Sequence, residues 1–356
     1  MTKRSTLAIT VGDPAGIGPE ITLRCLVDPA IQQATHAVAY GDPAILARAA
    51  EAIGLNVRLN VIANPRDGDD QPPEPGVIDV HDIGVIAKAD DIKWGVVQAL
   101  AGKAAVAAIE QATHDAQSGA VDGIVTAPIN KEAVWATGSK FLGHTEMIAD
   151  LCHAEFADTM FVVDDLCVFF ATRHMSLAEA VASIKCELID PQVRRALTAL
   201  SVYGHDKPRL AVAALNPHGG EGGHFGREEI DEIAPAIAAV NEDISAGRIV
   251  AAPVAGPVPA DSVFHQGLQG RFDGIVSLYH DQGHIATKTY DFDNTVSVTV
   301  GLPILRASVD HGTAFDIAGT GQASPATMRS AILTAVKFAD YNDRMKAQYG
   351  ASPNVN

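Results

Sequence analysis

Several common functional signals are missing or scarce in this 356-residue chain. Cysteine occurs only four times and never as a Cys-x-x-Cys pair, so a cysteine-based zinc site or a dithiol redox motif is disfavoured. Cations are outnumbered, since 26 lysines and arginines stand against 43 aspartates and glutamates and leave a formal net charge of −17. An acidic surface argues against nucleic acid or an anionic membrane as the main partner, although a local basic pocket can still bind an anionic substrate.

Long apolar runs and the standard nucleotide motifs are missing as well. No apolar run is long enough to span a bilayer, and the first residues lack the apolar region of a secretory signal. We therefore expect a cytoplasmic protein with reduced cysteines. The glycine-rich residues 12–18 and 219–226 do not fit G-x-G-x-x-G, and no G-x-x-x-x-G-K-[ST] occurs, which disfavours a standard Rossmann or P-loop site.

The chain does contain a regular alternation of strand and helix patterns. Short apolar runs such as 210–215 and 249–254 are typical of buried strands, whereas 96–116 and 228–240 carry apolar residues at helical spacing. This alternation predicts an α/β protein with a largely parallel sheet and helices on both faces. The chain length suggests two domains, or one unit of two lobes.

Three histidines share one kind of position in this pattern. His174, His218 and His280 each follow a mainly apolar run, so each should lie at the carboxyl end of a strand, where open α/β sheets bind ligands. Three neutral imidazoles that converge there would hold a divalent metal and leave a position open for substrate. Zinc suits them best, with cobalt, nickel, manganese or magnesium as alternatives. A lone histidine is more often structural, so the prediction depends on the shared placement.

Other residues point to an anionic ligand. His144 and Thr145 should lie at a helix N-terminus, which attracts anions, although Thr145 could simply cap that helix. Lys288 and Arg306 are cations in otherwise apolar stretches, and a cation in such surroundings needs an anionic partner. For Arg306, an internal ion pair and an anionic group of a substrate both remain open.

The glycine-rich residues 219–226 allow close approach of a ligand to the backbone and lead into a helix whose N-terminus could bind a phosphate. A plain loop before a helix is the alternative.

Six runs of this sequence resemble the 4-hydroxythreonine-4-phosphate dehydrogenase family. The resemblance extends over nearly the whole chain, and its motifs are long and specific; they lie at residues 12–20, 143–146, 215–226, 259–261, 279–283 and 308–313. The resemblance implies an isocitrate/isopropylmalate-dehydrogenase-like fold of two α/β lobes around a central cleft. It also implies a homodimer with its site at the interface. We expect one lobe to contain residues 1–127 with about 303–356, and the other about 128–302.

The resemblance also implies roles for single residues. The metal ligands of the family fall on His174, His218 and His280, and its Pro-Ala-Asp motif places Asp261. Substrate contacts fall on His144, Thr145, Lys288 and Arg306, and Lys288 or Asp261 is the candidate catalytic base. Contacts with the NAD cofactor are expected at Asn216, Gly219, Gly220, Gly222, Asp310, His311 and Gly312.

One substrate contact departs from the biosynthetic members of the family. Ser297 stands where they carry asparagine, and His284 also favours a second branch, whose enzymes act on 4-phospho-D-threonate or 4-phospho-D-erythronate. We therefore predict metal- and NAD-dependent oxidation, with decarboxylation, of the C3 hydroxyl of a phosphorylated four-carbon hydroxy acid. The alternatives are 4-hydroxythreonine-4-phosphate dehydrogenase of pyridoxal phosphate biosynthesis, a cis-dihydrodiol carboxylate dehydrogenase, and a catalytically silent ligand-binding homologue. The choice between NAD and NADP stays open.

Overall fold

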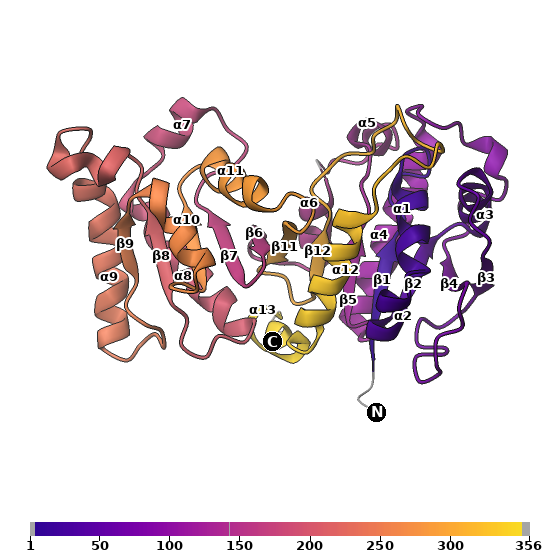
Figure 1. The fold of residues 1–356 in the computed structure, drawn as a ribbon, viewed down its shortest axis with the longest axis horizontal. Coiled ribbons are helices and arrows are strands. Elements are labelled where there is room, and N and C mark those ends of the chain that lie inside the picture. Colours follow the sequence, from indigo (N-terminus) through magenta and orange to yellow (C-terminus); the bar gives the residue numbers. More distant parts are fainter. Residues whose placement is uncertain (1–3, 142, 351–356) are drawn as a thin grey trace, which may run out of the picture. The chain divides into compact units, whose positions relative to one another are not determined.

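A computed structural model describes residues 4–141 and 143–350, and the chain divides into two compact units (Figure 1). The first unit contains the chain up to Ala157 and again from Val296, and the second unit is Asp158–Thr295. The second unit begins later than residue 128, where the sequence suggested a lobe boundary. The helix that contains Met147 and Ile148 stays with the first unit, because both side chains are buried in its core.

The sheet of the first unit is parallel except at one edge. Its strands follow the order β3-β4-β2-β1-β5-β12-β11; β11 and β12 pair antiparallel, and the other described pairs are parallel. The α/β class and the largely parallel sheet are therefore confirmed. The strands are β1 (Ser5–Thr10), β2 (Thr35–Gly41), β3 (Arg58–Val61), β4 (Val77–Asp82), β5 (Gly123–Thr126), β11 (Val296–Val300) and β12 (Arg306–Ser308).

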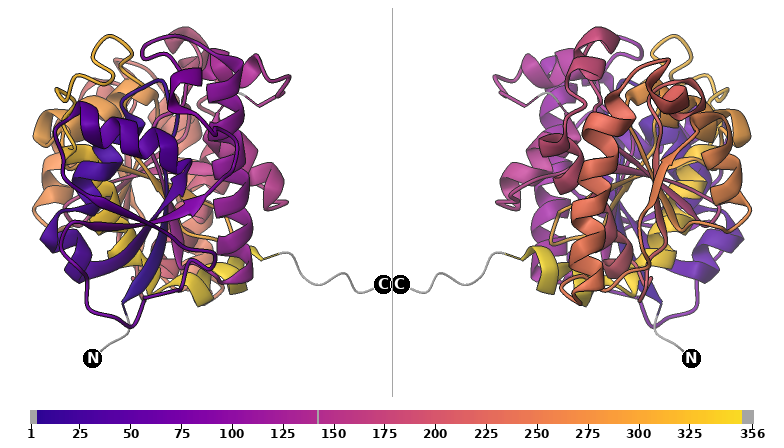
Figure 2. Two further views of the ribbon diagram at one scale, coloured as in Figure 1. Left: turned by 90° about the vertical axis from the view of Figure 1, so that its right-hand side faces the viewer. Right: turned by 90° about the vertical axis from the view of Figure 1, so that its left-hand side faces the viewer.

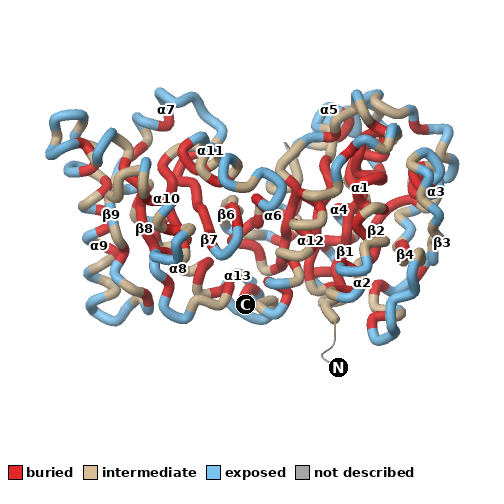
Figure 3. Tube along the Cα trace, viewed as in Figure 1, coloured by how far each residue is buried: buried red, intermediate tan, exposed pale blue. Residues whose placement is uncertain are grey.

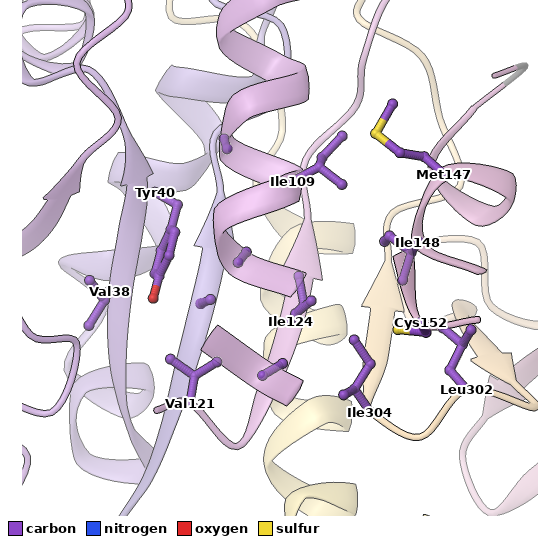
Figure 4. Close-up of a cluster of buried hydrophobic side chains, with 14 of the residues drawn as sticks. Val38, Tyr40, Ile109, Val121, Ile124, Met147, Ile148, Cys152, Leu302 and Ile304 are labelled. Atoms are coloured by element: carbon purple, nitrogen blue, oxygen red, sulfur yellow. The ribbon is translucent and has the colours of Figure 1, made fainter. Parts of the chain in front are cut away.

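Helices lie on both sides of this sheet (Figure 2). Ile109 of α4 and Met147 of α6 pack with Ala8 and Ile124 of the strands in one apolar cluster, which Figure 4 shows with α4 lying along the strands. The helices of the unit are α1 (Gly18–Leu26), α2 (Pro29–Ala34), α3 (Pro43–Ala52), η1 (Ala89–Asp91), α4 (Ala99–Ser118), α5 (Lys131–Trp135), α6 (His144–Leu151), α12 (Ala326–Ala339) and α13 (Asn342–Tyr349).

The second unit has a smaller sheet of the same kind. Its strands follow the order β6-β7-β10-β8-β9, with β6 and β7 antiparallel and the other pairs parallel. The strands are buried and the outer faces of the helices are exposed (Figure 3). The elements are β6 (Asp158–Val163), β7 (Leu166–Phe170), α7 (Leu177–Ala182), α8 (Cys186–Val202), β8 (Leu210–Ala213), η2 (Pro217–Gly223), η3 (Glu229–Ile233), α9 (Ala234–Ser245), β9 (Ala255–Val258), α10 (Ala260–Leu268), β10 (Gly274–Ser277) and α11 (His280–Tyr290).

One sequence-based prediction is wrong in this unit, and a second, a helix, is confirmed with a difference in its first turn. Residues 249–254 are not a strand, and β9 begins only at Ala255. Pro253 has no N–H for a ladder, and the Asn241 side chain binds both the N–H and the carbonyl of Val254 in place of a strand. The expected helix 228–240 begins as the π-helical turn η3 and becomes α-helical only at Ala234.

The glycine-rich residues 12–18 bring β1 and α1 close together. A Cβ at Gly18 would lie 2.0 Å from the Val11 carbonyl oxygen, so the start of α1 packs directly on the end of β1. Asp13 in this loop is 1% exposed, and its Oδ1 accepts from Ala15 N at 2.8 Å. The residues of this motif are buried, which explains their small size by packing rather than by exposure to a ligand.

Among the described residues, no helix is long and apolar enough to cross a membrane.

Candidate active site

The three histidines lie where the sequence placed them, after the ends of adjacent strands. His174 follows β7 and His218 follows β8, and His280 begins α11, separated by two residues from the end of β10, which pairs with both of those strands. Because these three strands are neighbours and parallel, their carboxyl ends meet at one edge of the sheet.

Two buried side chains connect these strand ends. Thr172, after β7, donates from Oγ1 to the Leu278 carbonyl after β10, at 2.8 Å. Gln282 donates from Nε2 to the Ala214 carbonyl after β8, at 2.8 Å, and accepts from Leu278 N at 2.7 Å. The loops that carry the histidines therefore start from fixed backbone positions.

Only part of the trio is assembled in the single chain. The rings of His174 and His280 have centroids 6.1 Å apart. His218 is exposed on η2 and has the left-handed φ of 54°, in a run of left-handed residues that includes Glu221. Over residues 4–141 and 143–350, no three His, Cys, Asp or Glu side chains converge to hold a metal ion.

One face of α11 carries a row of polar groups. His280, His284 and Lys288 are spaced by four residues, so they lie along one side of the helix. The His284 ring stacks on His280 with centroids 3.6 Å apart and an interplanar angle of 13°, and it also packs on Phe170 at 4.7 Å. Lys288 Nζ lies 5.9 Å from the centroid of the Phe161 ring. The His284 ring therefore packs against one face of the His280 ring.

Hydrogen bonds show which nitrogen of the His280 and His284 rings donates. His280 Nδ1 lies 2.6 Å from Asp281 Oδ1, and a carboxylate can only accept, so Nδ1 donates; in the neutral form of the ring the lone pair is then on Nε2. A ligand histidine is typically oriented by such a carboxylate. His284 Nδ1 donates in the same way to the His280 carbonyl at 2.8 Å. With Nδ1 bonded to Asp281, His280 has the orientation typical of a ligand histidine, and the His174 ring is a candidate second ligand, with centroids 6.1 Å apart.

The glycine-rich loop is organised by the protein's own carboxylates. Asn216 donates from Nδ2 to Glu228 at 2.6 Å and to Glu229 at 2.9 Å, and a Cβ at Gly220 would lie 2.9 Å from Glu229 Oε2. Gly219 and Gly222 would meet nothing within 4 Å. Because the carboxylates of Glu228 and Glu229 already occupy the start of this helix, a phosphate site there is disfavoured. Asp261 is exposed in the first turn of α10.

In the first unit, Arg306 is the central polar group. It is 5% exposed at the start of β12, and its guanidinium donates to Thr145 Oγ1 at 3.2 Å, Thr299 Oγ1 at 2.9 Å and Thr126 Oγ1 at 3.0 Å. Its Nε is buried without a partner. Burial lowers the Arg306 pKa to about 10, with a smaller opposing effect of Glu146. Its hydrogen bonds go to threonine hydroxyls and, among the described residues, no carboxylate forms an ion pair with it, so the internal ion pair is not formed.

His144 and Thr145 begin α6 next to this arginine. Burial, and secondly the charge of Arg306, hold the His144 pKa well below its ordinary value, so the ring is neutral near pH 7. His144 Nε2 is buried without a hydrogen-bond partner. A neutral imidazole lies next to a buried guanidinium whose Nε–H has no partner, and this arrangement is suited to binding an anion.

The remaining predicted residues of the first unit lie on or after β11 and β12. Ser297 is half-buried and opposite Ser308 in the antiparallel ladder. The segment 310–312 follows β12 after one residue, and a Cβ added at its exposed Gly312 would meet nothing within 4 Å. The sequence did not single out Thr126, Thr299 or Ser308, because hydroxyls within apolar strands carry no recognisable motif.

The second unit thus carries its three histidines at the carboxyl ends of parallel strands, where open α/β sheets bind ligands, and the first unit places Arg306 beside Thr126 at the carboxyl end of β5. The chain belongs to the family described as "Pyridoxal phosphate biosynthetic protein PdxA", which matches residues 33–335. This is a family of dehydrogenases, as the names of its similar members state.

The similar proteins differ in the substrate that they are named for. A Cutibacterium acnes protein with the provisional name D-threonate 4-phosphate dehydrogenase is 55% identical over 100% of both chains. A crystal structure of 4-hydroxythreonine-4-phosphate dehydrogenase from Klebsiella pneumoniae is 38% identical, covers 94% of this chain and 98% of that one, and has a TM-score of 0.86. A terephthalate 1,2-cis-dihydrodiol dehydrogenase from Burkholderia xenovorans is 30% identical, covers 94% and 98%, and has a TM-score of 0.62.

Proposed function

We propose that this protein is a metal- and NAD-dependent dehydrogenase that oxidises the C3 hydroxyl of 4-phospho-D-threonate or 4-phospho-D-erythronate, followed by loss of carbon dioxide. The observation that carries the choice of substrate is the 55% identity, over the full length, to the relative named for D-threonate 4-phosphate. Ser297 in place of asparagine supports the same branch.

The first unit supports an anionic substrate. Arg306 is a buried cation whose hydrogen bonds go to neutral hydroxyls, so its charge is left to be balanced by a ligand. Neutral His144 and the Thr145 hydroxyl complete the groups that would contact the substrate. Ser297 would contact it at the edge strand.

The second unit supports the metal. His174 and His280 would provide two ligands, with Asp281 orienting the His280 ring, and His218 the third. When bound, the divalent metal would supply Lewis-acid polarisation of the hydroxyl, and NAD would supply the hydride acceptor. Zinc suits three imidazoles best.

Lys288 is the preferred base. It shares the helical face of His280 and is half-buried, whereas Asp261 is exposed on α10 and is the second candidate. In its neutral form Lys288 would take the C3 hydroxyl proton as the C3 hydride leaves, giving a 3-keto acid. Such an acid loses carbon dioxide readily because the ketone accepts the electron pair of the broken bond.

The proposal includes a homodimer that completes the metal site. His174 and His218 are both exposed, and each has exposed apolar neighbours, Met175 and Leu177 for the first and Phe225 for the second. A dimer interface at these histidines would cover the exposed apolar side chains as well. We propose that His218 of the partner subunit joins His174 and His280.

A substrate comparison tests the proposed function. The zinc-loaded protein with NAD would be assayed for NADH and carbon dioxide with 4-phospho-D-threonate, 4-phospho-D-erythronate, 4-phosphohydroxy-L-threonine and a cis-dihydrodiol carboxylate. A highest kcat/KM with either of the first two supports the proposal. A highest value with the third or the fourth would assign the biosynthetic or the dihydrodiol activity instead. No turnover of any, with zinc and NAD bound, would indicate a silent homologue.

A further inference from the structure

A row of hydroxyl side chains crosses the sheet of the first unit at one level. Thr10 of β1 pairs with Thr126 of β5, Thr126 with Ser308 of β12, and Ser308 with Ser297 of β11. Paired residues of neighbouring strands point to the same face of a sheet. Arg306 lies two residues before Ser308 and therefore on this face too.

The hydrogen bonds in this row have a fixed direction. Arg306 can only donate, so Thr126 Oγ1 accepts from its Nη2 at 3.0 Å. Thr126 then has one proton to give, and it donates to Ser308 Oγ at 3.0 Å. Ser308 in turn donates to the Val309 carbonyl at 2.9 Å. The chain of bonds runs from the guanidinium to the backbone just before residues 310–312.

Burial makes this chain of bonds stiff. Thr126 is 0% exposed and Ser308 is 6% exposed, so water cannot replace a missing partner. Thr126 accepts a hydrogen bond from Nη2 of Arg306, and Thr145 and Thr299 accept from Nη1. The Nε–H of Arg306 is left without a partner. The plane of the guanidinium is thereby fixed before any anion binds.

We propose that Thr126 and Ser308 are positioning residues that fix the Arg306 guanidinium for the anionic group of the substrate and tie it to the backbone at Val309. This inference rests on the proposed function, because it takes Arg306 as the substrate's anion contact. The hydroxyl proton of each is donated within the protein, so neither hydroxyl is available to donate to the substrate.

Thr126→Val keeps the shape and removes the hydroxyl, and Thr126→Ser keeps the hydroxyl. The matched control is Thr10→Val, because Thr10 is equally buried on the adjacent strand and its Oγ1 has no partner. For 4-phospho-D-threonate we expect Thr126→Val to raise KM about tenfold with kcat within about twofold, because one charge-assisted bond is lost. Thr126→Ser should restore KM, and Thr10→Val should leave it unchanged.

Ser308→Ala should raise KM as Thr126→Val does, and the double variant should be no worse than either single variant, because both break one chain of bonds. An unchanged KM in folded Thr126→Val, a serine variant as impaired as the valine variant, an equal effect of Thr10→Val, or additive effects of the two substitutions would each overturn the proposal.

Calorimetric titration with inorganic phosphate separates this inference from the proposed function. If the wild type does not turn over the substrate but Thr126→Val still weakens phosphate binding about tenfold relative to Thr10→Val, the inference stands and the proposed function fails. If turnover occurs and Thr126→Val changes neither KM nor phosphate affinity, the inference alone fails. A wild type that neither turns over the substrate nor binds phosphate would overturn both.

Discussion

Replacing Arg306 with methionine should weaken substrate binding without destabilising the fold. Burial lowers the Arg306 pKa to about 10, which corresponds to a cost of about 3 kcal/mol for keeping the charge near pH 7. Methionine fills similar volume and removes this cost. It also leaves Thr126, Thr145 and Thr299 without their donor, at about 1 kcal/mol each. The two effects nearly cancel, so the free energy of unfolding should change by no more than about 1 kcal/mol.

The effect on binding should be large. Loss of a buried contact between opposite charges typically costs about 2–5 kcal/mol, so KM for 4-phospho-D-threonate should rise at least about 30-fold. The assay is the initial rate of NADH formation, with urea unfolding measured on the same samples. Arg66→Met is the control: Arg66 pairs with Asp122 at 2.8 Å, so its loss should lower stability and leave KM unchanged. A destabilisation by Arg306→Met of more than about 3 kcal/mol with unchanged KM would show a structural arginine and refute the reasoning.

Three further predictions concern single carboxylates and a lysine. Asp281→Ala should weaken zinc affinity about 10–100-fold in a chelator competition, because the carboxylate orients His280; an equal effect of exposed Asp293→Ala would contradict this. Lys288→Met should lower kcat about 100-fold or more with zinc content unchanged, and the exposed Lys185→Met should not; kcat close to the wild-type value would remove Lys288 as base. Burial raises the Asp13 pKa from 3.8 to about 6, so the folded state loses about 3 kcal/mol as pH rises from 4 to above 6. Asp13→Asn should therefore stabilise the protein at pH 7.5 and not at pH 4, and equal urea midpoint shifts at both would contradict the assignment.

Features that depend on the local pattern of apolar residues could be predicted from the sequence. The apolar runs before His174, His218 and His280 placed these residues at strand ends, and the structure confirms that β7, β8 and β10 precede them. The run 249–254 failed as a strand because its apolar composition does not reveal that Asn241 binds the backbone of Val254.

The contacts that organise the candidate site depend on residues far apart in the chain. Thr126 and Arg306 are separated by 180 positions and meet only because β5 and β12 are neighbours in the sheet. The stacking of His284 on His280 could be anticipated only once α11 was known to begin at His280. The orientation of His218 follows from a left-handed backbone, which residue identity alone does not specify for a histidine.

A complementation experiment decides whether His218 of the partner subunit completes a metal site with His174 and His280. Chains carrying His174→Ala and His218→Ala would be co-expressed with different tags, and heterodimers would be purified through both tags. Each homodimeric variant should be inactive, whereas the heterodimer contains one site with every histidine and should show about half of the wild-type kcat and zinc content. A heterodimer as inactive as its parents would contradict the shared site, and full activity of either parent would contradict the metal itself.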